Sequence, residues 1–178
     1  MRPGGKRHTQ EEMRVMGNVL FLCTGNSARS ILAESLLNHW SDGLFRGYSA
    51  GSFPKGAVHP MAVELLAQFG MPTEGLRSKS WDEFAKPGAP TMDYIFTVCD
   101  QAAGEVCPVW PGHPVTAHWG VADPAAITHS KTEQALAFRE AFRVLEARIR
   151  FFLTFRFKEL KRDELQRLVI DAGKLIPS

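Results

Sequence analysis

The sequence is poor in cysteine, in long apolar runs and in surplus charge. Three cysteines in 178 residues are few and odd in number, which argues against the disulfide framework of a small secreted protein. There is no CxxC pair, and the histidines that follow Cys107 lack the spacing of zinc ligands. No apolar run reaches the roughly 18–20 residues of a membrane span, and none follows the basic N-terminus as in a secretory signal. We therefore predict a cytoplasmic protein with reduced thiols and no membrane partner.

The charges are almost balanced, with 21 basic and 19 acidic residues and a formal net charge of +2. Residues 1–14 hold four of the basic and two of the acidic residues, so the rest of the chain is formally neutral. A neutral body argues against nucleic acid as a partner, because nucleic-acid binding needs a basic surface. The length suits one domain. We predict a flexible leader at 1–14 and a single catalytic domain at 15–178, which acts as a monomer.

Apolar segments typical of strands alternate with segments whose apolar residues recur at helical spacing. Strands are expected at 15–22, 45–52, 92–99 and 114–120, and helices at 28–39, 59–70, 131–155 and 160–176. Such alternation is typical of a layered α/β fold with a mostly parallel sheet. Ligands of these sheets bind beyond the carboxyl ends of the strands. Cys23 and Cys99 both lie at such ends, so we expect the two thiols at one site.

The segment from Cys23 to Ser30, CTGNSARS, joins the first strand to the first helix. Gly25 and Asn26 tolerate backbone angles that curl the loop, so that successive N–H groups can surround an anion at the helix N-terminus. Arg29 adds a planar pair of donors suited to a tetrahedral oxyanion. These groups would lower the pKa of Cys23 from ~8.5 to about 3.5–7.5, which makes it a thiolate nucleophile. Ser30 is expected to donate a further hydrogen bond to the sulfur.

This loop is the predicted oxyanion-binding site. Its contacts are expected from Thr24, Gly25, Asn26, Ser27, Ala28 and Arg29. The alternative interpretation is a buried cysteine at a strand end followed by a tight turn, because a C-x5-R pattern alone also occurs by chance. The strand before the loop, the Gly and Asn inside it and the helix after it favour the functional interpretation.

The segment VLFLCTGNSARS resembles the signature of the low-molecular-weight protein tyrosine phosphatase superfamily, and within it the thiol-coupled arsenate reductases. The resemblance covers residues 18–155 and includes TVCDQAAGEVCPVWPG and HWGVADPAA. It implies a three-layer fold whose four-stranded parallel sheet is flanked by helices, with the last helix of this chain as an addition. It also implies that Asp123, in the Asp-Pro dipeptide, protonates the leaving oxygen as a general acid.

The two further cysteines fit an arsenate reductase. After Cys23 attacks arsenate, a second thiolate must attack the sulfur of Cys23 so that arsenic leaves in the reduced state. We hypothesise a relay in which Cys99 makes that attack and Cys107 then attacks Cys99. A thioredoxin-like or glutaredoxin-like partner would reduce the exposed disulfide, with no bound cofactor. The alternative for Cys99 is a buried strand cysteine, the usual fate of a free cysteine.

Two other functions remain open at this stage. A phosphatase of the same superfamily would hydrolyse phosphate monoesters through a phosphorylated Cys23. An oxyanion-binding or thiol redox-sensing module would use the same loop without turnover. The residues after Asp-Pro favour a small inorganic oxyanion such as arsenate, because Ala125, Ala126 and Ile127 offer no aromatic wall for a substrate ring.

The resemblance further suggests a monovalent-cation site beneath the loop. In some arsenate reductases a potassium ion is held by residues that match Asn26, Glu34, Ser49 and Asp82. All four carry side-chain oxygens, so a potassium ion is a candidate accessory of the site; the alternative for each residue is an ordinary cap or surface group.

Overall fold

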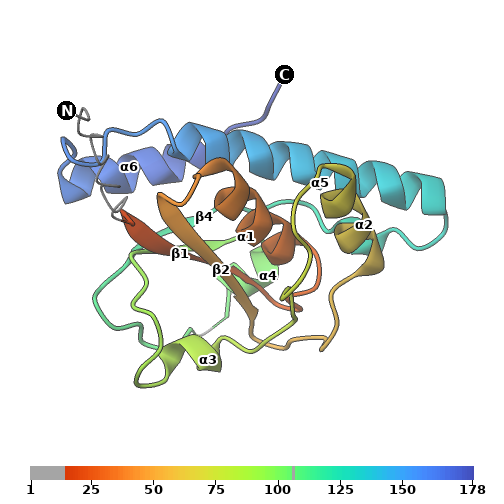
Figure 1. Ribbon diagram of the computed structural model, residues 1–178, viewed down its shortest axis with the longest axis horizontal. Coiled ribbons are helices and arrows are strands. Elements are labelled where there is room, and N and C mark those ends of the chain that lie inside the picture. The colour runs from red at the N-terminus through yellow and green to blue at the C-terminus, as the bar shows by residue number, and fades with distance from the viewer. Residues whose placement is uncertain (1–14, 106) are drawn as a thin grey trace, which may run out of the picture.

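The protein was analysed as a computed structural model, which describes residues 15–105 and 107–178. The predicted leader at 1–14 lies outside the described residues. Four strands form one sheet in the order β2-β1-β3-β4, and each neighbouring pair is parallel. The strands are β1 (Gly17–Cys23), β2 (Phe45–Gly51), β3 (Tyr94–Thr97) and β4 (Val115–His118). The predicted α/β fold with a four-stranded parallel sheet is confirmed (Figure 1).

Helices follow the strands in the expected alternation. They are α1 (Arg29–Trp40), α2 (Pro60–Gln68), α3 (Asp82–Ala85), α4 (Asp100–Ala103), the 3-10 turn η1 (Pro124–Ala126), α5 (Lys131–Phe152) and α6 (Arg162–Ala172). The sequence did not predict α3, because a single turn shows no apolar periodicity. None of the helices among the described residues is long and apolar enough to cross a membrane.

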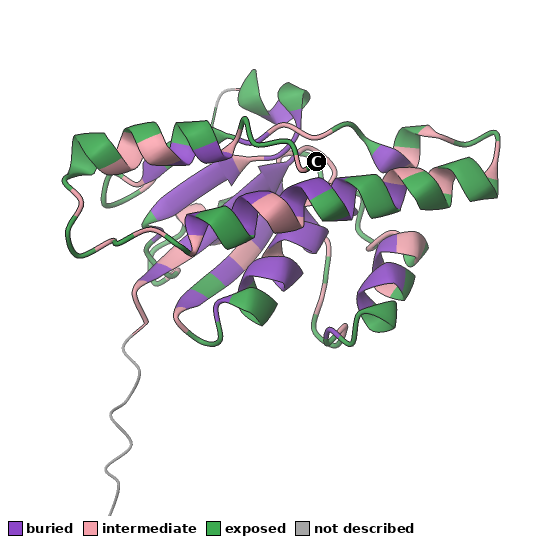
Figure 2. Ribbon diagram, turned by 90° about the horizontal axis from the view of Figure 1, so that it is seen from above, coloured by how far each residue is buried: buried purple, intermediate pink, exposed green. Residues whose placement is uncertain are grey.

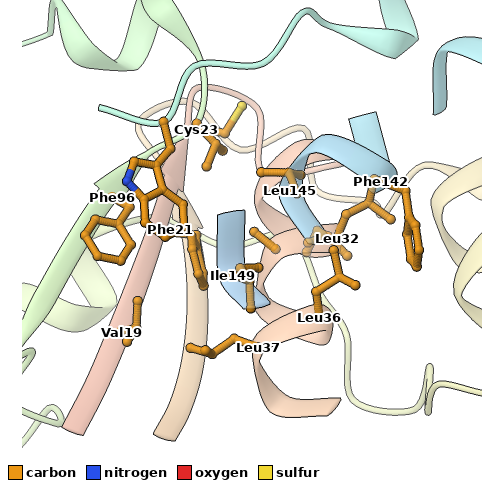
Figure 3. Close-up of a cluster of buried hydrophobic side chains, with 14 of the residues drawn as sticks. Val19, Phe21, Cys23, Leu32, Leu36, Leu37, Phe96, Phe142, Leu145 and Ile149 are labelled. Atoms are coloured by element: carbon orange, nitrogen blue, oxygen red, sulfur yellow. The ribbon is translucent and has the colours of Figure 1, made fainter. Parts of the chain in front are cut away.

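Strand β1 is buried on both faces, which explains its continuous apolar sequence. Val19 and Phe21 face the layer formed by α1 and α5, and Leu20 and Leu22 face the opposite layer with Phe84 of α3. Because successive side chains alternate, Cys23 has the same orientation as Val19 and Phe21. Figure 3 shows Cys23 at the end of this row, beside α1 and α5. The strand therefore fixes the direction of the thiol.

The long helix α5 covers one face of the sheet with a single apolar stripe. The residues that form this stripe are all buried, and they are Phe138, Phe142, Leu145, Ile149 and Phe152. Its remaining faces are largely exposed, and the sheet behind it is buried along its length (Figure 2). This apolar packing holds the ends of β1 and β3 in place.

The additional helix α6 covers the edge strand β4. Gln166 donates a hydrogen bond to the carbonyl oxygen of Thr116 at 2.7 Å, and the Trp119 indole N–H donates to the carbonyl of Val169 at 2.8 Å. Trp119 is fully buried and stacks on Phe96, with ring centroids 4.2 Å apart. An uncovered edge strand is open to pairing with other chains. The C-terminal helix thus protects the sheet edge and completes the core at Trp119.

Arg148 joins this C-terminal region to the segment that leads to Asp123. Its guanidinium is almost completely buried and donates to the carbonyl oxygens of Trp119 and Gly120, both at 3.1 Å, and of Leu175 at 3.0 Å. Burial lowers the pKa of Arg148. The three carbonyls replace the water that this buried cation has lost.

We expect Arg148→Met to lower the free energy of unfolding by about 3 kcal/mol, because buried carbonyls would lose their donors. Denaturant unfolding measures the change. The exposed Arg46 provides the control, since Arg46→Met should stay within about 0.5 kcal/mol of the wild type. Equal stabilities of the two variants would show that Arg148 carries no structural role.

Candidate active site

The predicted oxyanion loop lines a pocket of about 210 Å³ at the carboxyl end of the sheet. All loop residues from Cys23 to Arg29 contribute to its wall, and Asp123 closes it from the segment after β4. The structure thus brings together the predicted nucleophile, arginine and general acid. Phe53, Lys55 and Gln101 also line the pocket, and the sequence analysis had not identified them.

The loop is held by hydrogen bonds on its outer side. The carbonyl oxygens of Thr24, Gly25 and Ser27 accept from the backbone N–H groups of residues 53, 55 and 59, at 3.0, 2.9 and 2.8 Å. Asn26 adopts a left-handed conformation with φ of 43°, as expected for a curled loop. With these carbonyls tied outward, the loop is suited to offer its N–H groups to an anion.

Ser30 is placed behind the loop. It is fully buried, and its hydroxyl accepts a hydrogen bond from the side-chain amide of Asn26 at 2.8 Å. Ser30 therefore fixes Asn26 in this structure, and its bond to the sulfur of Cys23 stays a prediction.

A Cβ at Gly51 would collide with the carbonyl oxygen of Thr24, so glycine is required where β2 passes the loop.

Arg29 and Asp123 face each other across the pocket. One guanidinium nitrogen lies 3.6 Å from a carboxylate oxygen of Asp123, and another donates to the carbonyl of Val121 at 2.9 Å. Asp123 also accepts a hydrogen bond from the N–H of Ala125 at 3.0 Å. These contacts hold the carboxyl group over the mouth of the pocket, where a leaving oxygen would need a proton.

Cys99 lies beside Cys23, as expected from the positions of β1 and β3. It is 1% exposed and forms the N-cap of α4, where its sulfur accepts the N–H of Ala102 at 3.4 Å. The Thr24 hydroxyl lies 3.6 Å from the same sulfur. The Cys99 and Cys23 thiols also change each other's pKa, as neighbouring groups do. The structure thus pairs the two thiols at one end of the sheet.

The two thiols shift each other's pKa in opposite directions. The neighbouring Cys23, with hydrogen bonds from Ala102 and Thr24, lowers the pKa of Cys99 to about 5. Cys99, together with burial, raises the pKa of Cys23 despite the charge of Arg29. The two thiols therefore titrate as a coupled pair, and the thiolate on Cys23 stays a prediction. The sequence could not show this coupling, because it gives no distance between the thiols.

Cys107 is exposed at the surface. Partial desolvation of its thiol and the nearby Glu105 carboxylate raise its pKa. Its thiol points to the carbonyl oxygen of Glu105 at 3.8 Å. All three cysteines are free thiols in the structure. Glu105 itself reaches the loop, since it accepts a hydrogen bond from the Thr24 hydroxyl at 3.3 Å. The third thiol of the predicted relay thus lies in a segment tied to the loop by Glu105.

A further group of polar residues flanks Cys99, and no sequence signal had identified it. His118 bonds to the Thr97 hydroxyl at 2.7 Å and to the carboxylate of Asp100 at 2.8 Å. Asp100 is the first residue of α4, immediately after Cys99. These contacts link the end of β4 to the short helix that positions Cys99.

The predicted cation ligands are only partly brought together. Ser49 donates to the carboxylate of Glu34 at 2.7 Å, and Asn26 lies in the adjoining loop, whereas Asp82 is exposed on α3. The ammonium group of Lys79 lies 3.5 Å from the Ser49 oxygen. Within the described ranges, no group of three or more His, Cys, Asp or Glu residues could hold a metal ion. The structure thus places the Lys79 ammonium beside one of the four predicted ligands, and the potassium site stays a prediction.

Comparison with known proteins places this geometry in a family. A sequence profile described as low molecular weight phosphotyrosine protein phosphatase matches residues 18–166. An arsenate reductase of Shouchella clausii is 33% identical over 134 residues, which cover 75% of this chain and 93% of that protein. An arsenate reductase of Halalkalibacterium halodurans is 34% identical over 134 residues, with the same coverage of 75% and 93%.

Solved structures of arsenate reductases have a similar fold. The structure of arsenate reductase from Archaeoglobus fulgidus matches with a TM-score of 0.60 and 27% identity, over 77% of this chain and 99% of that chain. A thioredoxin-dependent arsenate reductase of Corynebacterium glutamicum matches with a TM-score of 0.56 and 28% identity, over 75% of this chain and 58% of that chain. This protein belongs to the family of low molecular weight phosphotyrosine protein phosphatases.

Proposed function

We propose that this protein reduces arsenate to arsenite with electrons from an external thiol reductant. The observation that carries the proposal is the coupled pair of Cys23 and Cys99 thiols at the oxyanion pocket. A phosphatase needs only the first of these thiols, whereas a reductase needs both. The arsenate reductases among its relatives support the same conclusion.

In the first step, the sulfur of Cys23 attacks arsenic. The Cys23 proton passes to the neighbouring Cys99, which generates the thiolate nucleophile. Arg29 and the loop N–H groups bind the charged oxygens. One As–O bond breaks, and Asp123 protonates the departing hydroxide to give water. The product is an As(V) thioester of Cys23.

In the second step, Cys99 loses its proton again and attacks the sulfur of Cys23. The electron pair of the S–As bond passes to arsenic, so arsenic leaves as As(III) in arsenite and a Cys23–Cys99 disulfide forms. Cys107 then attacks Cys99, which frees Cys23 and leaves a Cys99–Cys107 disulfide. Because Cys107 is exposed, a dithiol partner can reach this disulfide.

The reductant that we propose is thioredoxin-like, with a glutaredoxin-like protein as the alternative. The similar Corynebacterium glutamicum protein is thioredoxin-dependent. We place the reaction in the cytoplasm, where such partners keep thiols reduced. No bound cofactor enters these steps.

Hydrolysis of phosphate monoesters is the second candidate function. The exposed ring of Phe53, at 73% exposure, lies on the rim of the pocket and could stack on an aryl substrate. The sequence analysis had found no such aromatic wall after Asp-Pro. Because of Phe53, hydrolysis of an aryl phosphate is measured beside arsenate reduction in the test below.

The test is a pair of assays on the wild-type protein. Arsenate with thioredoxin, thioredoxin reductase and NADPH should give steady NADPH consumption that depends on arsenate, and an aryl phosphate without reductant should turn over slowly or not at all. Exchanging thioredoxin for glutaredoxin and glutathione identifies the partner. Fast ester hydrolysis with no arsenate-dependent consumption would instead establish a phosphatase, and inactivity in both assays an oxyanion-binding module.

A further inference from the structure

A buried lysine lies directly behind the oxyanion loop. Lys79 is only 8% exposed, although lysine is among the residues least often buried. It belongs to the segment between α2 and α3 that runs beside the end of β2. The N–H of Gly51 donates to the Lys79 carbonyl at 2.9 Å, and Gly51 forms a parallel bridge with Ser80.

A short chain of polar groups compensates the positive charge of the Lys79 ammonium group. The ammonium donates to the carbonyl oxygen of Arg77 at 2.9 Å and to the Ser49 hydroxyl at 3.5 Å. Ser49 is fully buried and in turn donates its proton to the carboxylate of Glu34 at 2.7 Å. Positive charge, hydroxyl and negative charge thus follow one another in a consistent direction. Such pairing is what makes a buried charge tolerable.

The same lysine is connected to the oxyanion loop through its backbone. Its N–H donates to the side-chain oxygen of Asn26 at 2.8 Å, and the amide of Asn26 donates to Ser30 at 2.8 Å. The neighbouring Ser78 hydroxyl donates to the carbonyl of Gly25 at 3.2 Å. The segment held in place by the Lys79 side chain therefore fixes the loop at its left-handed residue.

This arrangement differs from the potassium site that the resemblance suggested. The side-chain oxygens of Ser49 and Asn26 already accept hydrogen bonds from Lys79, and Asp82 is exposed on α3. We propose that the Lys79 ammonium is a built-in cation that positions the oxyanion loop, so that the protein needs no monovalent metal ion. Lys79 is a positioning residue, because it acts on the anion through Asn26. The proposal rests on the proposed function only in treating this loop as the oxyanion site.

The test compares Lys79→Met, Lys79→Arg and Lys79→Ala with the control Lys158→Met, which changes an exposed lysine far along the chain. Sulfate affinity is measured by calorimetry, and arsenate reduction is measured in potassium, sodium and choline chloride at equal ionic strength. We expect the wild type and the control to agree within twofold in all three salts. Lys79→Met should bind sulfate at least tenfold more weakly, and Lys79→Arg should retain most of the affinity.

Rescue by added cations separates a positioning charge from simple packing. In Lys79→Ala, potassium or ammonium ions should recover at least threefold in sulfate affinity, and the bulky choline ion should not. A wild type at least threefold faster in potassium than in choline would overturn the proposal. A folded Lys79→Met protein with wild-type sulfate affinity would also overturn it. If Lys79→Met gives no cooperative melting transition, Lys79→Arg and Lys79→Ala decide.

The sulfate measurements are independent of the proposed activity. If arsenate is not reduced but the Lys79 variants lose sulfate affinity as expected, the proposed function fails and the built-in cation stands. If arsenate is reduced and the variants bind sulfate normally, the proposed function stands and the built-in cation fails.

Discussion

Replacing Cys99 with serine is expected to reduce thioredoxin-coupled arsenate reduction to background, a loss of roughly 10³-fold or more. Serine is close in size to cysteine but its hydroxyl cannot attack the sulfur of Cys23 to release arsenite. NADPH consumption measures the loss. Cys99→Ser should still bind oxyanions, since the loop and Arg29 are unchanged. Steady arsenate reduction by this variant would exclude the relay.

The two thiols should also change each other's pKa when either is replaced. Cys99→Ala removes the largest cause that raises the pKa of Cys23 and leaves Arg29 and the Gly25 N–H, so the pKa of Cys23 should fall. Cys23→Ala removes the largest cause that lowers the pKa of Cys99, which should rise from about 5 toward the ~8.5 of a free cysteine. At neutral pH, Cys23→Ala should therefore lose its thiolate.

Thiolate absorbance at 240 nm against pH measures these shifts, with Cys107→Ser added to each variant so that the third thiol does not contribute. The control is the single Cys107→Ser protein, which should keep one thiolate down to about pH 5 because the pair is intact. A Cys99 that still titrates near 5 in Cys23→Ala would show that the N-cap of α4 and Thr24 lower its pKa without Cys23.

The position of the thiols could be predicted because strand geometry is regular. The apolar run before Cys23 defines β1, and the third apolar run, which forms β3, ends at Cys99; parallel neighbours necessarily bring their carboxyl ends to one edge. The charge on the thiols could not be predicted in this way. It depends on the N-cap of α4 and on Thr24, which come together only in the folded protein.

The interior behind the loop escaped prediction for a related reason. Lys79 lies in a segment whose apolar residues show no periodic spacing. From the sequence, a lysine in such a segment is predicted to be exposed. Its burial follows from the pairing of this segment with the end of β2 and from the carboxylate of Glu34 on α1. Asp82 is a predicted cation ligand only by its match to a family position, and the sequence does not indicate that its side chain is exposed on α3. Exposure and burial in both cases depend on tertiary contacts.

Asp123→Asn is expected to lower kcat for arsenate reduction by about 10²- to 10⁴-fold, the usual contribution of a general acid. Asparagine has nearly the same shape and can still accept the N–H of Ala125, so the turn at η1 should be kept. It cannot supply a proton to the hydroxide that leaves arsenic. The first step should then limit the rate, and the As(V) thioester should form slowly.

The affinity of Asp123→Asn for an anion should not fall along with its kcat. Removing the negative charge 3.6 Å from Arg29 frees its donors and reduces repulsion at the pocket, so sulfate should bind to Asp123→Asn at least as tightly as to the wild type. Calorimetry measures this affinity, and single-turnover arsenate reduction measures the rate. Asp163→Asn, on the exposed face of α6, is the matched control and should change neither. If Asp123→Asn kept its rate and lost sulfate affinity, Asp123 would be holding the loop rather than supplying the proton. A slow variant that binds its anion well is the result that only an acid at this position explains.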